Sequence, residues 1–105
     1  MKLMKPDEIE GMMQSNPNLF VVDVRGDELY GSVKLPYKNM INIPLAYIDG
    51  RLGEIPKDKK IVVVCHAGKQ SLQAGPYLTG KGFDVAGCLE GGMMAWQKAG
   101  KQVQK

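Results

Sequence analysis

One cysteine of the sequence, Cys65, lies where an apolar segment ends and a glycine-containing loop begins. The apolar run at 61–65 reads IVVVC, the loop at 66–70 reads HAGKQ, and a helical pattern starts at Ser71. A loop between a strand and a helix can turn successive backbone N–H groups inward, and the positive end of the helix adds to their effect. The pattern therefore predicts an anion-binding loop around the sulfur of Cys65.

Such a loop changes the chemistry of a thiol. An ordinary thiol, with a pKa of about 8.5, is only about 3% thiolate at pH 7, whereas helix termini and cationic neighbours lower thiol pKa values to about 3.5 to 7.5. A decrease of about two units in the pKa of a thiol corresponds to about 2.7 kcal/mol in favour of the thiolate. The same donors would stabilise a persulfide. The alternative is an inert thiol, since free cysteines are among the most buried residues.

We therefore predict that Cys65 is a catalytic nucleophile. Its anionic substrate is expected to bind the backbone amides of the loop and the Lys69 side chain, so the predicted binding residues are His66, Ala67, Gly68, Lys69 and Gln70. His66 is the single histidine, and a general-base role is the alternative to a side chain that faces solvent.

Other notable side chains are assigned mainly to structure. Cys88 is expected near the same sheet edge as Cys65, as a small buried hydrophobic residue or, alternatively, as a resolving thiol. Arg25 is expected to pair with Glu28, and Asp23 to bond to the backbone or to Arg25. In the last helix, core contacts are expected of Met93, Met94 and Trp96.

The elements that position Cys65 follow from alternating patterns along the chain. Apolar, β-branched runs predict strands at 19–24, 40–44, 61–65 and 83–89. Helical spacing predicts helices at about 6–15, 71–79 and 93–99 and a helical turn at 45–49, with a kink or a weakened turn at Gly75-Pro76. This alternation predicts an α/β fold, a small parallel sheet with helices on both faces. Ligands bind such sheets at the carboxyl ends of the strands, where Cys65 is expected.

Length and composition indicate one domain, 1–105, with a flexible tail at about 101–105. The formal charge of +3, from 14 Lys and Arg against 11 Asp and Glu, comes from scattered lysines, so we expect no nucleic-acid partner. No apolar run predicts a membrane span, and the start lacks a secretory signal. We expect a cytoplasmic protein, or a periplasmic one if a leader was removed. The 2 cysteines have no zinc-ligand spacing, and neither a metal nor a cofactor is expected.

Several motifs together resemble the single-domain rhodaneses, a sulfurtransferase family. They are DVR at 23–25 followed by Glu28 and Tyr30, NIP at 42–44, the loop CHAG at 65–68, and LEGGM with Ala95-Trp96 from Leu89 onward. The resemblance implies a rhodanese-like fold and a double displacement through a persulfide on Cys65. Thiosulfate or a similar anionic donor would supply the sulfur, and cyanide, a thiol or a redox protein would accept it. The oligomeric state is not predicted.

The chain also departs from the family pattern. The segment 31–40, GSVKLPYKNM, lacks the family's usual motif, so the wall of the site there is not predicted. Gln70 stands where many members carry arginine, which binds an oxyanion with two prongs.

Two other functions compete with sulfur transfer. A non-catalytic rhodanese-like module, which binds a partner or carries sulfide, is one alternative, because fold alone does not establish activity. A cysteine phosphatase is a more distant one, since that chemistry needs an arginine at the position that Ser71 occupies.

Overall fold

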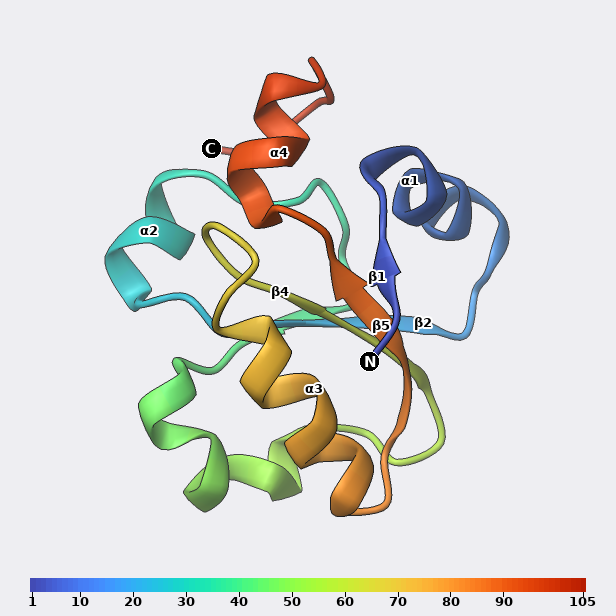
Figure 1. Ribbon diagram of the computed structural model, residues 1–105, viewed down its shortest axis with the longest axis vertical. Coiled ribbons are helices and arrows are strands. Elements are labelled where there is room, and N and C mark those ends of the chain that lie inside the picture. Colours follow the sequence, from blue (N-terminus) through green and yellow to red (C-terminus); the bar gives the residue numbers. More distant parts are fainter.

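The computed structural model describes residues 1–105 and contains a five-stranded, fully parallel sheet with the strand order β1-β5-β4-β2-β3. Figure 1 shows this sheet in the middle of the molecule, with helices on both sides. The strands are β1 (Leu3–Met4), β2 (Leu19–Asp23), β3 (Met40–Asn42), β4 (Lys60–Val64) and β5 (Asp84–Leu89). The α/β fold with a parallel sheet is the one predicted from the sequence.

The helices cover the sheet in two layers. They are α1 (Pro6–Ser15), α2 (Asp27–Ser32), α3 (Ser71–Gly80) and α4 (Gly92–Lys98), and a 3₁₀ segment, η1, spans Leu45–Glu54. In Figure 1, α1 and α4 lie above the sheet, and α3 lies below it. Side chains of β4 alternate between the layers, because successive residues of a strand point to opposite faces.

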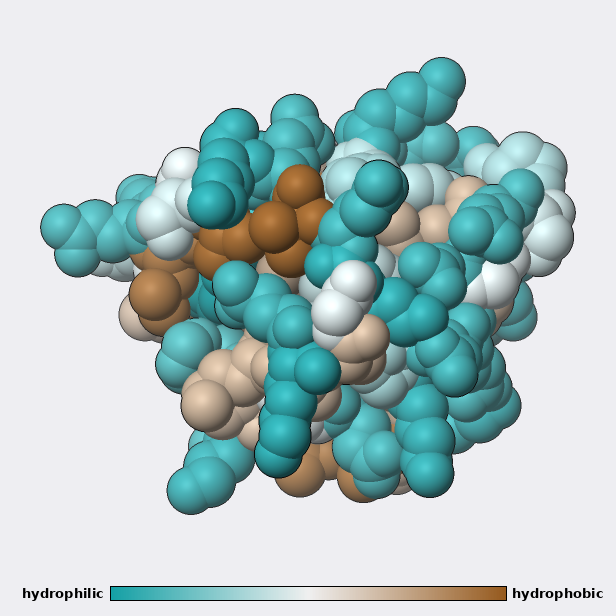
Figure 2. All heavy atoms as spheres, turned by 90° about the horizontal axis from the view of Figure 1, so that it is seen from above, coloured by the Kyte–Doolittle hydropathy of each residue, from teal (hydrophilic) through white to brown (hydrophobic).

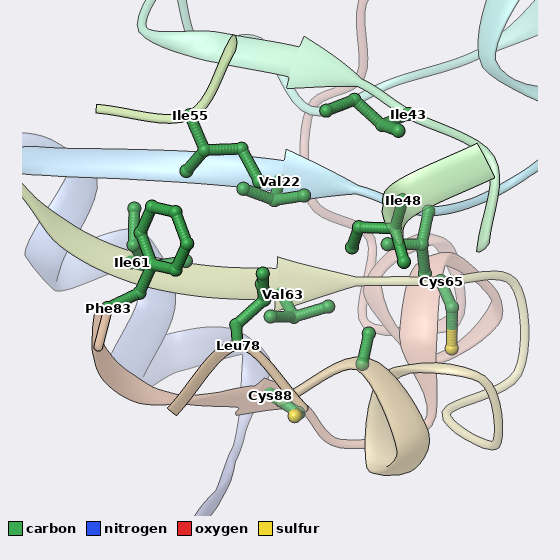
Figure 3. Packing of buried hydrophobic residues seen from close by; sticks show 12 residues of the cluster. Val22, Ile43, Ile48, Ile55, Ile61, Val63, Cys65, Leu78, Phe83 and Cys88 are labelled. Carbon is green, nitrogen blue, oxygen red and sulfur yellow. The ribbon is translucent and has the colours of Figure 1, made fainter. Parts of the chain in front are cut away.

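Two apolar clusters fill the space between the sheet and these layers. Val63 and Cys65 pack with Ile48 of η1 and Leu78 of α3 (Figure 3). On the other face, the second cluster joins Val62 and Val64 of β4 to side chains of α1 and α4, namely Ile9, Met93 and Trp96. The β-branched runs are therefore buried on both faces, which explains their continuous apolar sequence.

Two short elements were not predicted. β1 has only 2 residues, and α2 has 6 residues, none of them buried. Elements of this size leave no periodic pattern in a sequence. The helix α3 runs without interruption from Ser71 to Gly80, although Pro76 lies inside it.

The end of the chain contacts the rest of the fold, and one expectation about α4 is wrong. Gln104, in the segment expected to be flexible, exchanges two backbone hydrogen bonds of 2.9 and 2.8 Å with Lys34. The indole Nε1 of Trp96 also donates to the carbonyl of Gln102 at 2.7 Å. Met94 was expected in the core, but it is 54% exposed, because α4 turns it away from the sheet while Met93 and Trp96 are buried.

The surface over α1 and α4 is mostly hydrophilic. Figure 2 shows this face with long polar side chains and small hydrophobic patches between them. No helix has the length and apolar character that crossing a membrane requires.

Candidate active site

Cys65 follows β4 directly, at the carboxyl edge of the sheet, and its side chain is on the side of α3 (Figure 3). The residue is 1% exposed, so its sulfur lies at the bottom of the loop rather than on the surface. The loop 66–70 connects it to α3, which begins at Ser71. This is the strand, loop and helix arrangement that the sequence predicts.

The start of α4 fixes the backbone of this loop. The amide of Met93 donates to the carbonyl of Cys65 at 2.8 Å, and that of Met94 donates to the carbonyl of His66 at 3.0 Å. Because the C=O and N–H of a trans peptide point in opposite directions, the amides of His66 and Ala67 point away from α4. Glycine is required at Gly92, where φ is +63° and a Cβ would lie 2.4 Å from the carbonyl oxygen of Cys65.

The loop amides are free for a ligand. No acceptor within the protein is bonded to the backbone N–H of His66, Ala67, Lys69 or Gln70. The remaining amide, that of Gly68, donates to Cys65 Sγ at 3.0 Å. Free amides grouped in one loop form an anion-binding concavity.

A second group contacts the sulfur from α3. Ser71 is completely buried, and its Oγ lies 3.4 Å from Cys65 Sγ and 3.4 Å from the carbonyl oxygen of Gly68. A hydroxyl can accept from a thiol and donate to a thiolate. In the sequence, Ser71 stands out only as the start of a helix and as a position that lacks an arginine. The signal that could have identified it is its place in the first turn of the helix that follows the loop 66–70.

The opposite side of the site comes from the segment after β2. A cleft of about 310 Å³ is lined by Cys65, the loop and two residues of that segment, Gly26 and Leu29. This wall has no signal in the sequence, because α2 is too short and too exposed to show a periodic pattern.

Arg25 holds this wall in place, but not through the partner expected for it. Its guanidinium pairs with Asp23, with Nη2 2.8 Å from Oδ2, and the side chains are 1% and 0% exposed. The predicted ion pair with Glu28 is wrong, because Arg25 points inward whereas Glu28 faces solvent on α2. The structural role expected of Asp23 agrees with these contacts.

The same guanidinium connects the sheet to α2. Its Nη1 donates to the carbonyl of Leu29 at 3.3 Å and its Nη2 to that of Val33 at 2.7 Å. Asn42 of β3 supports the same turn by donating to the carbonyls of Asp23 and Arg25 at 3.0 and 2.8 Å. The position of the wall therefore depends on Arg25.

The polar side chains of the loop lie at the mouth of the cleft. His66, Lys69 and Gln70 are exposed and line it. None of the three side chains makes a hydrogen bond or an ion pair within the protein. No arginine lines the cleft, and Lys69 is the only lysine there.

Cys88 lies deeper than Cys65. It is completely buried, and its Sγ donates to the carbonyl of Ser71 at 3.1 Å. Burial raises the pKa of its thiol. Its surroundings are those of the small buried hydrophobic residue that the sequence analysis favours.

Known proteins resemble this chain along nearly its whole length. A family model described as "Rhodanese-like domain" matches residues 5–99. A sulfurtransferase of Allochromatium vinosum is 29% identical over 94 residues, which are 90% of this chain and 86% of that protein. The thiosulfate sulfurtransferase GlpE of Shewanella oneidensis is 34% identical over 80 residues, or 75% of this chain and 76% of the relative. The crystal structure of a rhodanese-like domain protein from Staphylococcus aureus superposes with a TM-score of 0.83 at 30% identity and covers 100% of both chains.

Proposed function

We propose that this chain, which belongs to the rhodanese-like domain family and has sulfurtransferases among its relatives, transfers sulfane sulfur through a persulfide on Cys65. The observation that carries the proposal is the surroundings of the Cys65 sulfur. The sulfur accepts a backbone hydrogen bond, contacts a buried hydroxyl, and lies beside loop amides that no group of the protein uses. This arrangement suits a sulfur that alternates between thiolate and persulfide.

The proposed cycle has two displacements. The Cys65 thiolate attacks the outer sulfur of thiosulfate or a similar donor. A new S–S bond forms to Cys65, the S–S bond of the donor breaks, and sulfite leaves with the electron pair. Cyanide or a thiolate then attacks the outer sulfur of the persulfide, which releases the product and restores the Cys65 thiolate. The sequence of steps is a ping-pong covalent mechanism.

The loop would stabilise each anionic species in turn. The amides of residues 66–70 would hold the oxygens of the donor and then the outer sulfur of the persulfide, and the Lys69 ammonium would add a point charge at the mouth. Fixed amides in a partly closed site stabilise a developing charge without having to reorganise. The acceptor would be a small nucleophile or the thiol of a redox protein.

One experiment tests this function directly. The reduced protein is incubated with thiosulfate, and its intact mass is measured for the addition of one sulfur, which peptide mapping should place on Cys65. Cyanide should then remove the sulfur as thiocyanate. If no donor adds sulfur to the protein, the non-catalytic binding or sulfide-carrying module becomes the better account.

Replacement of Gln70 by arginine should improve the use of thiosulfate. Gln70 lies at the mouth of the cleft, and a guanidinium there can form charged, two-pronged hydrogen bonds to the donor oxygens. Such a bond contributes about 1.5 to 3 kcal/mol when buried, so in this exposed position we expect KM for thiosulfate to fall about threefold to tenfold. Steady-state kinetics with cyanide as acceptor measure the change.

Gln73→Arg is the matched control for that substitution. Gln73 is also exposed, but it is the third residue of α3 and does not line the cleft. The substitution Gln73→Arg adds the same net charge without placing a guanidinium at the donor. Equal effects of the two substitutions, or no effect of Gln70→Arg, would contradict a local role for residue 70.

Removal of the Ser71 hydroxyl should slow the first displacement. Ser71→Ala takes away the group 3.4 Å from Cys65 Sγ, and one neutral hydrogen bond contributes about 0.5 to 1.5 kcal/mol. We expect the rate of persulfide formation, measured in a single turnover with thiosulfate, to fall about threefold to tenfold. Urea unfolding of the same variant separates this effect from a loss of fold. An unchanged rate would show that the hydroxyl only fills space.

A further inference from the structure

We propose that Leu29 determines donor specificity and that the cleft favours sulfane-sulfur donors with an apolar organic substituent over inorganic thiosulfate. The inference rests on the proposed function, because it concerns the molecule from which Cys65 takes its sulfur. It follows from the shape, composition and charge of the cleft.

Leu29 supplies an apolar surface opposite the nucleophile loop. The cleft of about 310 Å³ lies between Gly26 and Leu29 on one side and Cys65, His66, Ala67, Lys69 and Gln70 on the other. Leu29 is 42% exposed, so much of its side chain is available for contact. The volume of the cleft is close to about 300 Å³, the lower limit for pockets that hold organic ligands. A donor made only of sulfur and oxygen atoms would leave this apolar surface in contact with water.

The exposed position of Leu29 is fixed by the fold. Arg25 Nη1 donates to the Leu29 carbonyl at 3.3 Å, and the guanidinium is locked by its buried ion pair with Asp23. A second bond, from Arg25 Nη2 to Val33, holds the end of α2. The backbone at Leu29 is therefore held by a buried network, which keeps this residue at the edge of the cleft.

The charges around the cleft point to the same class of donor. Lys69 is the only lysine or arginine that lines it. A dianion such as thiosulfate therefore meets a single cationic side chain there. A thiosulfonate monoanion needs less cationic charge, and its carbon substituent can contact Leu29.

The sulfur transfer from such a donor is balanced without another reactant. The Cys65 thiolate attacks the outer sulfur of benzenethiosulfonate and forms the S–S bond of the anionic persulfide. The bond from that sulfur to the sulfonyl sulfur breaks, and benzenesulfinate leaves with the electron pair.

The test compares benzenethiosulfonate with thiosulfate for the native protein and two leucine variants. The readout is the ratio of the two kcat/KM values, with cyanide as acceptor. We expect a ratio above ten in the native protein, and Leu29→Ala should lower it about threefold to tenfold, the effect of a few lost apolar contacts in a pocket. Leu72→Ala is the matched control, because Leu72 is 45% exposed on α3 but does not line the cleft. The ratio of the two kcat/KM values for Leu72→Ala should equal that of the native protein.

The outcomes separate this inference from the proposed function. If both donors load Cys65 but the native ratio is near or below one, or if Leu29→Ala and Leu72→Ala change it equally, the role of Leu29 is wrong and sulfur transfer stands. If neither donor adds sulfur to Cys65 in the intact mass, the proposed function itself fails. Urea unfolding of both variants shows whether a change in ratio reflects a loss of fold.

Discussion

Cys65→Ser is expected to lower kcat/KM for sulfur transfer by on the order of 10³-fold or more and to abolish the added sulfur in the intact mass. The sulfur of Cys65 is the only nucleophile at the base of the cleft, and the hydroxyl of serine ionises far less readily than a thiol. Oxygen in its place also cannot form a persulfide. The fold should survive, because the two side chains are similar in size and Ser71 and Gly68 offer hydrogen-bond partners.

Cys88→Ala serves as the control for that experiment. It removes the other thiol of the chain, which is completely buried and contacts the carbonyl of Ser71. We expect this variant to take up one sulfur from thiosulfate as the native protein does, with a loss of about 1 kcal/mol in unfolding free energy for the small cavity. Sulfur uptake by Cys65→Ser, or its absence in Cys88→Ala, would contradict the assignment of the nucleophile.

Arg25→Ala is expected to cost about 3 to 5 kcal/mol of unfolding free energy, the usual cost of breaking a buried ion pair. The variant leaves the Asp23 carboxylate buried without its partner, and it removes the donors to the carbonyls of Leu29 and Val33. Because small domains have only about 5 to 15 kcal/mol of stability in total, this loss should be plain in urea unfolding monitored by circular dichroism.

Arg51→Ala provides the comparison for a surface ion pair. Arg51 and Glu54 form a pair whose side chains are 37% and 47% exposed, and such exposed pairs contribute little to stability because water screens their charges. Arg25→Lys gives an intermediate case, since lysine keeps the charge but loses the planar fork that contacts Asp23 and α2. If Arg25→Ala destabilises the protein no more than Arg51→Ala, the buried network does not hold α2 as described.

The sequence predicted the parts of the fold that have a strong local pattern. The run at 61–65 is apolar and β-branched, so it identified β4 and placed Cys65 at the end of a buried strand. The loop after it could be identified because glycine and a following helix have local signals. The inward direction of the loop amides has a weaker signal in the sequence, because it depends on hydrogen bonds that α4 donates to the carbonyls of Cys65 and His66.

The remaining parts depend on contacts that no local pattern encodes. Arg25 lies near both Asp23 and Glu28 in the sequence, and only the packing of β2 shows which carboxylate is buried beside it. Leu29 belongs to a helix too short and too exposed to show a period, so the wall that it forms was not predicted. The contact of Ser71 with the sulfur requires the turn of the loop over Gly68, where φ is +91°.

The burial of Cys88 has a consequence for the lifetime of a sulfur-loaded protein. Val63 is the register partner of Cys88, and Cys65 lies two residues after Val63, just past the end of β4. At the strand rise of about 3.3 Å per residue, this offset adds about 6.6 Å along the chain to the spacing between neighbouring strands, which exceeds the Cα separation that a disulfide spans without backbone movement. A raised thiol pKa also keeps Cys88 protonated and poorly nucleophilic. Internal discharge is therefore blocked, and in the proposed cycle the loaded form waits for an external acceptor. Its decay in solution should follow acceptor concentration, so that the protein acts as a store of reactive sulfur when acceptors are scarce.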